Sequence, residues 1–175
     1  MAVVIVATVG GAGSNSFVLL SEAATYMTGR LNSSAWDDAT TDEQNRALVE
    51  ATRELDVLPW AGKRVDTTQL LSWPRQWVIN PDDPNYACYA LTVVPTRVKD
   101  ATCELAFQFL KAGTGDVAAQ DVTAGVIRKK VDVLETEWAT PGQRTAGLRR
   151  YPRVWDRLSS LLMVGGGVNI PVIRG

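Results

Sequence analysis

The feature that most constrains this chain is an amphipathic helical segment at residues 41–58, with a marked start and stop. Thr41-Asp42-Glu43-Gln44 has the form of a capping box, in which a hydroxyl and an amide side chain close the first helical turn. Pro59 ends the segment because proline has no backbone N–H to donate. The apolar side chains in between recur at helical spacing: Leu48, Ala51, Leu55 and Leu58. Such a stripe must be buried against other elements, which are expected to be further helices.

Three more segments show helical spacing, which predicts a mainly α fold: a small bundle of about four helices. One is expected from Ser21, as its cap, to about Leu31. The other two are expected from Pro95 to Gly113 and from Pro152 to Gly165. Their predicted buried stripes are Ala23, Tyr26, Met27 and Leu31; Val98, Ala101, Thr102, Leu105 and Phe109; and Val154, Trp155, Leu158, Leu161 and Leu162. Cys103, beside the second stripe, is expected to be packed rather than reactive.

Residues 60–91 have no such periodicity and are rich in prolines, tryptophans and tyrosines. A loop this long inside a compact domain is usually functional or pinned by packing, so we expect an ordered connection held by aromatic side chains. Base stacking by the six tryptophans is the alternative. Their scatter along the chain favours the core and interfaces.

Between residues 126 and 138 the pattern becomes that of a β-hairpin. Residues 126–131 and 134–138 would pair across a turn at Asp132-Val133, which sets a basic strand opposite an acidic one. A two-stranded hairpin is marginal in water by itself. We therefore predict that it contacts a neighbouring subunit through Arg128, Lys129, Lys130, Glu135, Glu137 and Trp138. For the basic run, a solvated strand edge is the alternative.

The chain divides into an N-terminal arm (1–13), a helical domain (14–163) and an extended C-terminal tail (164–175). The tail follows a glycine hinge at 165–167 and is apolar, with a proline that forbids helix. So short a segment cannot form a core, so we expect it to dock on another subunit, as an added strand or a groove-bound arm. Both apolar ends are thus expected to be completed by neighbours. The alternative for the tail is that it folds back on its own domain.

Charge is balanced overall but unevenly placed. The net charge is −1, yet residues 1–62 hold 3 basic and 8 acidic side chains, whereas residues 141–175 hold 6 basic and 1 acidic. Near-zero net charge argues against a protein that coats nucleic acid. Ends of opposite sign would suit head-to-side contact between copies in a ring, and ordinary solvated charge is the alternative.

The sequence contains few residues or motifs that could serve in catalysis. The chain has no histidine, and its two cysteines lie far apart, without a metal-binding spacing. The adjacent carboxylate pairs lie at turns and helix starts, where carboxylates commonly cap: Asp37-Asp38, Asp42-Glu43 and Asp82-Asp83. The glycine-rich stretch 10–14 lacks the ending of a phosphate-binding loop. We expect no enzyme activity, no cofactor, no metal and no membrane contact.

Several segments together resemble a family of tailed-bacteriophage proteins, often labelled DnaT-like single-stranded-DNA-binding proteins, that look like head–tail connectors (adaptors). Trp73-Pro74-Arg75 and Lys99-Asp100-Ala101-Thr102-Cys103 are the most specific of them. The others are Asn15-Ser16-Phe17-Val18, Leu31-Asn32, the helix from Leu48 to Asp56, Trp60-Ala61-Gly62-Lys63-Arg64, the hairpin from Lys130 to Trp138, and Tyr151-Pro152-Arg153-Val154. The resemblance covers about residues 15–163.

This resemblance implies a structural virion protein, made in the host cytoplasm, that forms a homo-oligomeric ring, commonly a dodecamer, at the neck. Its partners would be the portal protein, a tail-side connector, nozzle or tail terminator, and double-stranded DNA that passes through the channel without sequence recognition. We expect portal docking through Val168, Ile170, Pro171, Val172, Ile173, Arg174, Arg149, Arg150 and Arg153. The alternative function is single-stranded-DNA binding in phage replication.

Overall fold

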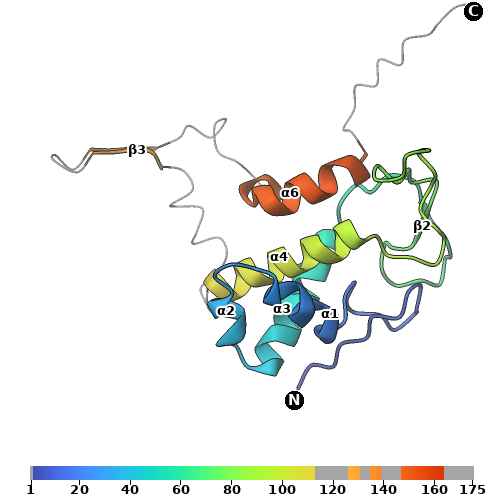
Figure 1. Cartoon of the computed structure of the whole chain (residues 1–175), viewed down its shortest axis with the longest axis horizontal. Helices are drawn as coiled ribbons and strands as arrows, with labels where there is room; N and C mark the ends of the chain where they lie inside the picture. The colour runs from blue at the N-terminus through green and yellow to red at the C-terminus, as the bar shows by residue number, and fades with distance from the viewer. Residues whose placement is uncertain (1, 113–125, 131–134, 139–146, 164–175) are drawn as a thin grey trace, which may run out of the picture.

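The computed structural model covers the whole chain and describes residues 2–112, 126–130, 135–138 and 147–163 (Figure 1). It is mainly helical, as predicted. The helices are α1 (Leu20–Thr28), α2 (Ser34–Asp37), α3 (Thr41–Asp56), α4 (Thr96–Ala112) and α6 (Pro152–Leu158), with 3-10 turns η2 (Gly147–Arg150) and η3 (Ser159–Leu161) around α6. The strands are β1 (Lys63–Arg64), β2 (Arg75–Gln76), β3 (Val126–Lys130) and β4 (Glu135–Trp138).

Helix α4 is the centre of the bundle. It packs against α3 on one side and α6 on the other, and the short helices α1 and α2 also touch it (Figure 1). The predicted stripe on α4 is buried at Val98, Ala101, Thr102 and Leu105, whereas Phe109 is half-buried. Each fully buried leucine contributes about 1.5–3 kcal/mol through removal of its apolar surface from water. The bundle therefore holds itself together mainly by apolar burial.

Helix α3 differs from its prediction only at its ends: it stops at Asp56, so that the half-buried Leu58 lies beyond it, and its cap is displaced by one residue. The cap is Thr40, one residue before the predicted Thr41: its hydroxyl accepts a hydrogen bond from the Glu43 backbone N–H, and the Glu43 carboxylate accepts one from the Thr40 backbone N–H. A carboxylate closes this capping box instead of the Gln44 amide, because Glu43 stands three residues after Thr40.

The first helix departs further from its prediction. It begins after Leu19, whose backbone N–H is held by the Glu22 carboxylate, so Ser21 lies inside the helix and is not its cap. It ends at Thr28, and Leu31 is 87% exposed rather than part of the buried stripe. The helical spacing of the apolar residues predicted a buried stripe that continues to Leu31, about one turn beyond the end of the helix at Thr28. The last helix is also shorter than predicted, since α6 passes into the 3-10 turn η3 instead of running to Gly165.

The hairpin is confirmed as an antiparallel pair. Lys130 lies opposite Glu135, Lys129 opposite Thr136 and Arg128 opposite Glu137, so the basic strand does face the acidic one. The strands are one residue shorter at the turn than predicted, and an irregularity lies between Val126 and Arg128. The predicted turn at Asp132-Val133 lies outside the described residues.

The N-terminal arm corrects one expectation: it lies against its own domain instead of awaiting a neighbour. The Val3 backbone N–H donates to Asp42 Oδ1 at 2.9 Å, and Asn45 Nδ2 donates to the Val3 carbonyl at 2.8 Å. Ile5 packs against the core. Sequence inspection missed these contacts because their partners stand about 40 residues away on α3. The C-terminal tail, 164–175, lies outside the described residues.

Candidate functional site

The most unusual part of the molecule is the loop between α3 and α4, and Arg75 organises its first half. The Arg75 guanidinium donates to the carbonyls of Ala61 at 2.6 Å, Gly62 at 2.7 Å and Ser72 at 3.2 Å. Burial holds the pKa of this guanidinium below its usual range, with the nearby Arg64 charge adding to the effect. One side chain thus satisfies backbone groups that would otherwise lack partners in a loop with little regular structure.

Gly62 lets the two short strands of this loop approach each other. Its φ is +68°, and a Cβ built on it would lie 2.1 Å from the Gln76 carbonyl oxygen. No other residue type fits this contact without backbone movement. The β1–β2 pair that follows, with Lys63 opposite Gln76 and Arg64 opposite Arg75, was not predicted.

Aromatic side chains hold the loop together, as expected, and Trp60 attaches it to α3 through a hydrogen bond from its Nε1 to the Leu55 carbonyl at 3.0 Å. Trp73 is buried, with its ring centroid 5.6 Å from that of Trp60 and 6.1 Å from that of Tyr89, both edge to face. Such pairs add about 0.5–1.5 kcal/mol beyond the area they bury. Asp56 at the end of α3 completes this anchor, because its carboxylate accepts a hydrogen bond from the Ser72 backbone N–H at 2.5 Å.

The second half of the loop forms a small hairpin around residues 78–89. The Tyr89 N–H donates to the Val78 carbonyl at 2.9 Å, and a β-bridge joins Ile79 to Cys88. Its far end is tied to α4 by Arg97, which binds both carboxylate oxygens of Asp82. This interaction holds the pKa of Asp82 below its usual range. The whole loop is therefore built as a fixed structure.

What this fixed loop presents to solvent is apolar. Trp77 is 63% exposed and Tyr86 is 71% exposed, and both have left-handed backbones, with φ of 62° and 55°. That conformation costs a residue with a Cβ about 1–2 kcal/mol. Outliers of this kind cluster at functional sites, and burial of these two rings does not offset the cost here.

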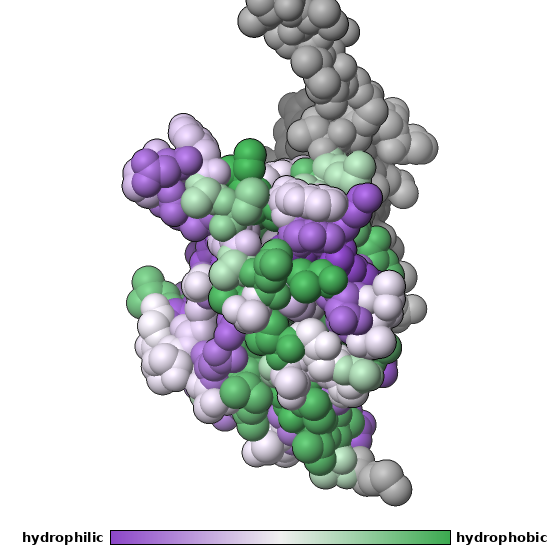
Figure 2. All heavy atoms as spheres, turned by 90° about the vertical axis from the view of Figure 1, so that its right-hand side faces the viewer, coloured by the Kyte–Doolittle hydropathy of each residue, from purple (hydrophilic) through white to green (hydrophobic). Residues whose placement is uncertain are grey.

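Other apolar side chains of the loop are exposed as well. We call the exposed loop residues the loop platform: Val65, Leu70, Trp77, Ile79, Tyr86, Leu91 and Val93. Figure 2 faces the side of the molecule where the loop and the arm lie, and it shows apolar side chains in a broken band down this face. Exposed apolar side chains mark an interaction site where they lie next to one another.

Charges around the loop platform nearly cancel. Lys63 Nζ lies 5.4 Å from the Trp77 ring centroid, in cation–π contact, and Arg64 is exposed beside it. Asp66 and Asp82 are acidic neighbours in the same loop. At Trp77 the loop therefore places one exposed aromatic ring beside two cations, and the loop as a whole carries acidic side chains that offset them.

A second cluster joins α1, α4 and α6 around Glu104, which is only 2% exposed. The Tyr26 hydroxyl donates to Glu104 Oε1 at 2.9 Å, and Arg30 Nε lies 3.3 Å from the same oxygen. Arg157 Nη2 donates to the Tyr26 oxygen at 2.7 Å. Burial raises the pKa of Tyr26 to about 12, so its hydroxyl keeps its proton at neutral pH. This network stabilises the packing of α6.

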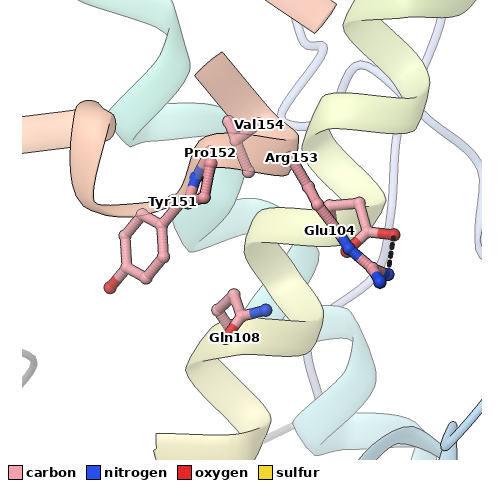
Figure 3. A pocket seen from close by; sticks show the side chains of 6 residues that line it. All are labelled: Glu104, Gln108, Tyr151, Pro152, Arg153 and Val154. Carbon is pink, nitrogen blue, oxygen red and sulfur yellow. Dashed lines mark ion pairs between the residues drawn. The ribbon is translucent and has the colours of Figure 1, made fainter. Parts of the chain in front are cut away.

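A shallow pocket of about 220 Å³ lies beside this cluster (Figure 3). Its lining includes Glu104 and Gln108 of α4, with Tyr151 and Pro152 at the start of α6. Arg153 reaches across it toward Glu104, 3.9 Å away. The Glu104 carboxylate is already compensated by Arg30, so the pocket provides no unpaired charge for a ligand.

The predicted portal-docking arginines lie together at α6 only in part. Arg149 and Arg153 are exposed there, with the Arg149 guanidinium 4.9 Å from the Trp155 ring centroid. Arg150 belongs to η2, but its side chain is not described. The remaining residues of that prediction, in the tail, lie outside the described residues, and the side chains predicted to contact a neighbour through the β3–β4 hairpin are not described either.

In the described part of the chain, the acidic residues considered for catalysis have structural partners. The carboxylate pairs lie in caps and turns: Asp42 binds Val3 and Arg46, Glu43 caps α3, and Asp82 binds Arg97. Within the described ranges, no group of three or more histidine, cysteine or acidic side chains could hold a metal ion. Nor does any helix described there have the length and apolarity to cross a membrane. Cys103 is packed, as predicted, and burial raises the pKa of its thiol to about 12.

Comparison with known protein families gives a match over the whole chain. A family profile described as "Putative DnaT-like ssDNA binding protein" matches residues 1–175. The chain belongs to this family. No curated protein and no solved structure matches it. The DnaT-like family label agrees with one half of the resemblance seen in the sequence, and it says nothing of a head–tail connector.

For this DnaT-like chain, sequence inspection found the Trp73-Pro74-Arg75 segment but not what it does. It also missed Trp77 as an exposed ring. Composition alone cannot separate Trp77 from the buried Trp60 and Trp73, because all three stand in one aperiodic stretch.

Proposed function

We propose that this chain is a structural assembly protein: a head–tail adaptor that joins the capsid of a tailed bacteriophage to its tail. The observation that carries the proposal is the loop platform, a set of exposed apolar side chains on a loop that polar and aromatic contacts hold in place. Centres of protein interfaces are rich in aromatic residues, and two of the exposed loop side chains are aromatic: Trp77 and Tyr86. The step from an assembly surface to the phage neck rests on the resemblance of the sequence to head–tail connectors.

Two ends of the molecule would serve different partners in this proposal. The α6 end, with Arg149, Arg150 and Arg153, would face the portal. The loop platform would face a neighbouring subunit or the tail-side protein. The α2 and α3 surface, where Asp37, Asp38 and Glu43 are exposed, is acidic and lies across α4 from α6 (Figure 1). Such separation of charge suits repeated contact between copies in a closed ring.

A deletion of the gene in the phage that encodes this chain tests the proposal directly. We expect DNA-filled heads without tails, alongside free tails, in electron micrographs of the lysate. The unchanged chain supplied from a plasmid should restore tailed particles. A chain with Trp77→Ser and Ile79→Ser should not restore them, whereas Val57→Ser, at another exposed apolar position, should. Tailed particles formed in the absence of the chain would contradict the proposed adaptor function.

A second function, single-stranded-DNA binding, is favoured by the contact of Lys63 with the exposed Trp77 and by the family label. Single-strand binders stack bases on aromatic rings beside basic side chains. If two cations neutralise two phosphates, the logarithm of the binding constant falls with the logarithm of the salt concentration with a slope of only about −1.4. Binding of single-stranded DNA at this site would therefore be weak. For this reason the geometry favours assembly.

The second function has its own test. Titration with an oligothymidine at low salt would quench the fluorescence of Trp77, and Trp77→Phe would remove that change while keeping a stacking ring. Replication arrest before any heads are filled, in the phage deletion described above, would favour this function over the adaptor. An unchanged fluorescence signal would eliminate it.

A further inference from the structure

The returning strand of the small hairpin at 78–89 is largely exposed, apolar and uncharged. Tyr86 is 71% exposed, and Cys88 and Ala90 further along the strand are exposed too. Residues 85–94 contain neither a charged side chain nor a proline. Charges, prolines and bulges are the usual means by which proteins keep a free strand edge from pairing with another chain. This strand therefore lacks two of these protections.

The hydrogen bonds of the hairpin fix which backbone groups of this strand point outward. The Tyr89 N–H donates to the Val78 carbonyl at 2.9 Å. The Asn80 N–H donates to the Ala87 carbonyl at 2.8 Å. Because the N–H and C=O of one peptide group point in opposite directions, the Cys88 N–H and carbonyl both point away from the hairpin. Neither has a hydrogen-bond partner within the described ranges.

Two residues to either side, each outward position has one backbone group that is occupied and one that is free. The Tyr86 N–H donates to the Asp83 carbonyl at 3.0 Å, and the Ala90 carbonyl accepts from the Val93 N–H at 3.2 Å. The Tyr86 carbonyl and the Ala90 N–H have no partner among the residues that the structure describes. The Ala87 N–H points inward to Asp83 Oδ1 at 3.5 Å, so the carbonyl of the same peptide group, that of Tyr86, points outward.

The opposite edge of the hairpin is less suited to an added strand. Ile79 lies opposite Cys88 and, like it, points its N–H and carbonyl outward. At the next outward position along that edge stands Pro81, which has no N–H to donate. The loop lies at the periphery of the molecule, around the label β2 in Figure 1. An added strand is therefore expected at the Cys88 edge.

We propose that residues 86–90 pair with the same residues of a second copy of this chain, antiparallel, about a two-fold axis at Cys88. In this register the Cys88 N–H of each copy donates to the Cys88 carbonyl of the other. The Ala90 N–H of each copy donates to the Tyr86 carbonyl of the other. The register asks nothing of the Tyr86 N–H and the Ala90 carbonyl, which already have partners in their own chain. Free groups meet free groups, and this self-complementarity identifies the occupant as a second copy.

The side chains agree with this register. Tyr86 stands opposite Ala90, and Ala87 stands opposite Tyr89, so that each tyrosine meets a small side chain. A two-fold axis at Tyr86 or at Ala90 would instead require backbone groups that are already occupied. No charged side chain lies between residues 85 and 94, so two copies approach without repulsion along the strand.

On one face of the pair, apolar side chains of the two copies form a continuous row. Ile79 and Cys88 are a non-hydrogen-bonded pair, so their side chains lie close together on the same face, and both are exposed. The two-fold axis brings the Cys88 side chains of both copies together, with Ile79 of each copy on the outside. In the free chain the pairing would cover Ile79 and Tyr86 of the loop platform.

The inference goes beyond the proposed function and does not depend on it. A two-fold contact closes after two copies, whereas a ring needs contacts between different surfaces of neighbouring copies. Failure of the pairing would leave the adaptor proposal unaffected, since that proposal is tested by the particles found in the phage deletion.

The native Cys88 thiol tests the position of the two-fold axis. Facing residues of a hydrogen-bonded pair lie about 5.5 Å apart between Cα atoms, within disulfide reach. Mild oxidation of the full-length protein should therefore give a dimer linked through Cys88 as the main product. The control combines Cys88→Ser with Ala90→Cys, which moves the thiol along the same edge and off the axis, and should give little dimer. Equal yields from the two proteins would overturn the proposal.

Exchange of charge at Cys88 tests the pairing without a covalent bond. Cys88→Lys and Cys88→Glu each set like charges directly opposite each other, so each alone should dimerise about fivefold more weakly than the unchanged chain in sedimentation experiments. A mixture of the two should recover the dimer. Cys88→Ser, which keeps the backbone N–H, should dimerise normally. An unchanged chain that stays monomeric, or a Cys88→Lys variant that dimerises equally well, would overturn the proposal.

A substitution at Ala90 tests the register. Ala90→Pro removes an N–H that has no partner in the described part of its own chain, so its melting temperature should match that of the control Ala90→Ser. In the unchanged chain and in Ala90→Ser, exchange of the Cys88 amide hydrogen should slow about tenfold or more at high protein concentration. We expect Ala90→Pro to lose this protection. Protection that is equal in the two variants, or absent from the unchanged chain, would show that the pairing is wrong.

Discussion

The helical bundle and the loop between α3 and α4 reach a fixed structure by opposite means. In the bundle, α4 lies between α3 and α6, and apolar side chains at helical spacing exclude water. In the loop, the Arg75 guanidinium, the Trp73 ring and the Asp82–Arg97 ion pair hold a backbone that has little regular hydrogen bonding. The bundle hides its apolar surface, whereas the loop, because its own anchors are polar and aromatic, can leave apolar side chains exposed.

A loop with little regular secondary structure can thus be held in one conformation by side-chain contacts. A surface used for docking loses less entropy on binding when it is already fixed. The loop platform is fixed by contacts beneath it, so the exposed rings are free to serve a partner. Substitutions in the two regions should therefore separate stability from docking.

Trp73→Ala should destabilise the protein most, and it tests whether the loop is as firmly held as the helical bundle. Trp73 is buried between Trp60 and Tyr89, so its loss should lower the free energy of unfolding by about 3–5 kcal/mol, no less than Leu48→Ala in the bundle. Urea unfolding followed by circular dichroism measures both. A cost below that of an exposed substitution would show that the loop folds independently of the bundle.

Glu104→Gln is expected to be next in size. It leaves Arg30 partly buried beside an amide in place of a carboxylate, at a cost of about 3 kcal/mol. Because the Glu104 network joins α6 to α1 and α4, hydrogen exchange should rise first in α6. The control Glu54→Gln, on the exposed side of α3, should change little. Uniform exchange across the bundle would show that the network does not act on α6 in particular.

Gly62→Ala should cost at least about 2 kcal/mol, from its left-handed backbone and from the contact of the new Cβ with the Gln76 carbonyl. Gly13→Ala is the matched control, since a Cβ there meets nothing within 4 Å. Thermal unfolding compares the two. Equal melting temperatures would mean that the β1–β2 approach can relax without loss.

The smallest effect on stability, with a large effect on docking, is expected for Trp77→Asn. Asparagine tolerates the left-handed backbone that tryptophan strains, so the free energy of unfolding should change by no more than about 0.5 kcal/mol. Production of tailed particles in the phage deletion should nevertheless be lost. A variant that supports assembly normally would remove Trp77 from the docking surface and weaken the contrast drawn between the two regions.

Much of the fold could be predicted because helices and hairpins have periodic apolar patterns that can be seen in short segments of sequence. The α3 stripe, the buried side of α4, the pairing of β3 with β4 and the packing of Cys103 all follow from spacing and composition. The errors fell at element ends, where one residue or one turn is decided by a single hydrogen bond, as at Thr40 and Leu19. The candidate site was located only as an aromatic-rich loop expected to be ordered.

The order of amino acids is enough to show which segments are helical and which of their faces are apolar, because those properties repeat every few residues. The tertiary structure alone decided that Trp77 points outward while Trp73 points inward, that the arm lies on α3, and that Glu104 is compensated by Arg30. These contacts join groups far apart along the chain or identical in composition. Local periodicity carries no information about them, since only the folded backbone brings a donor to its acceptor.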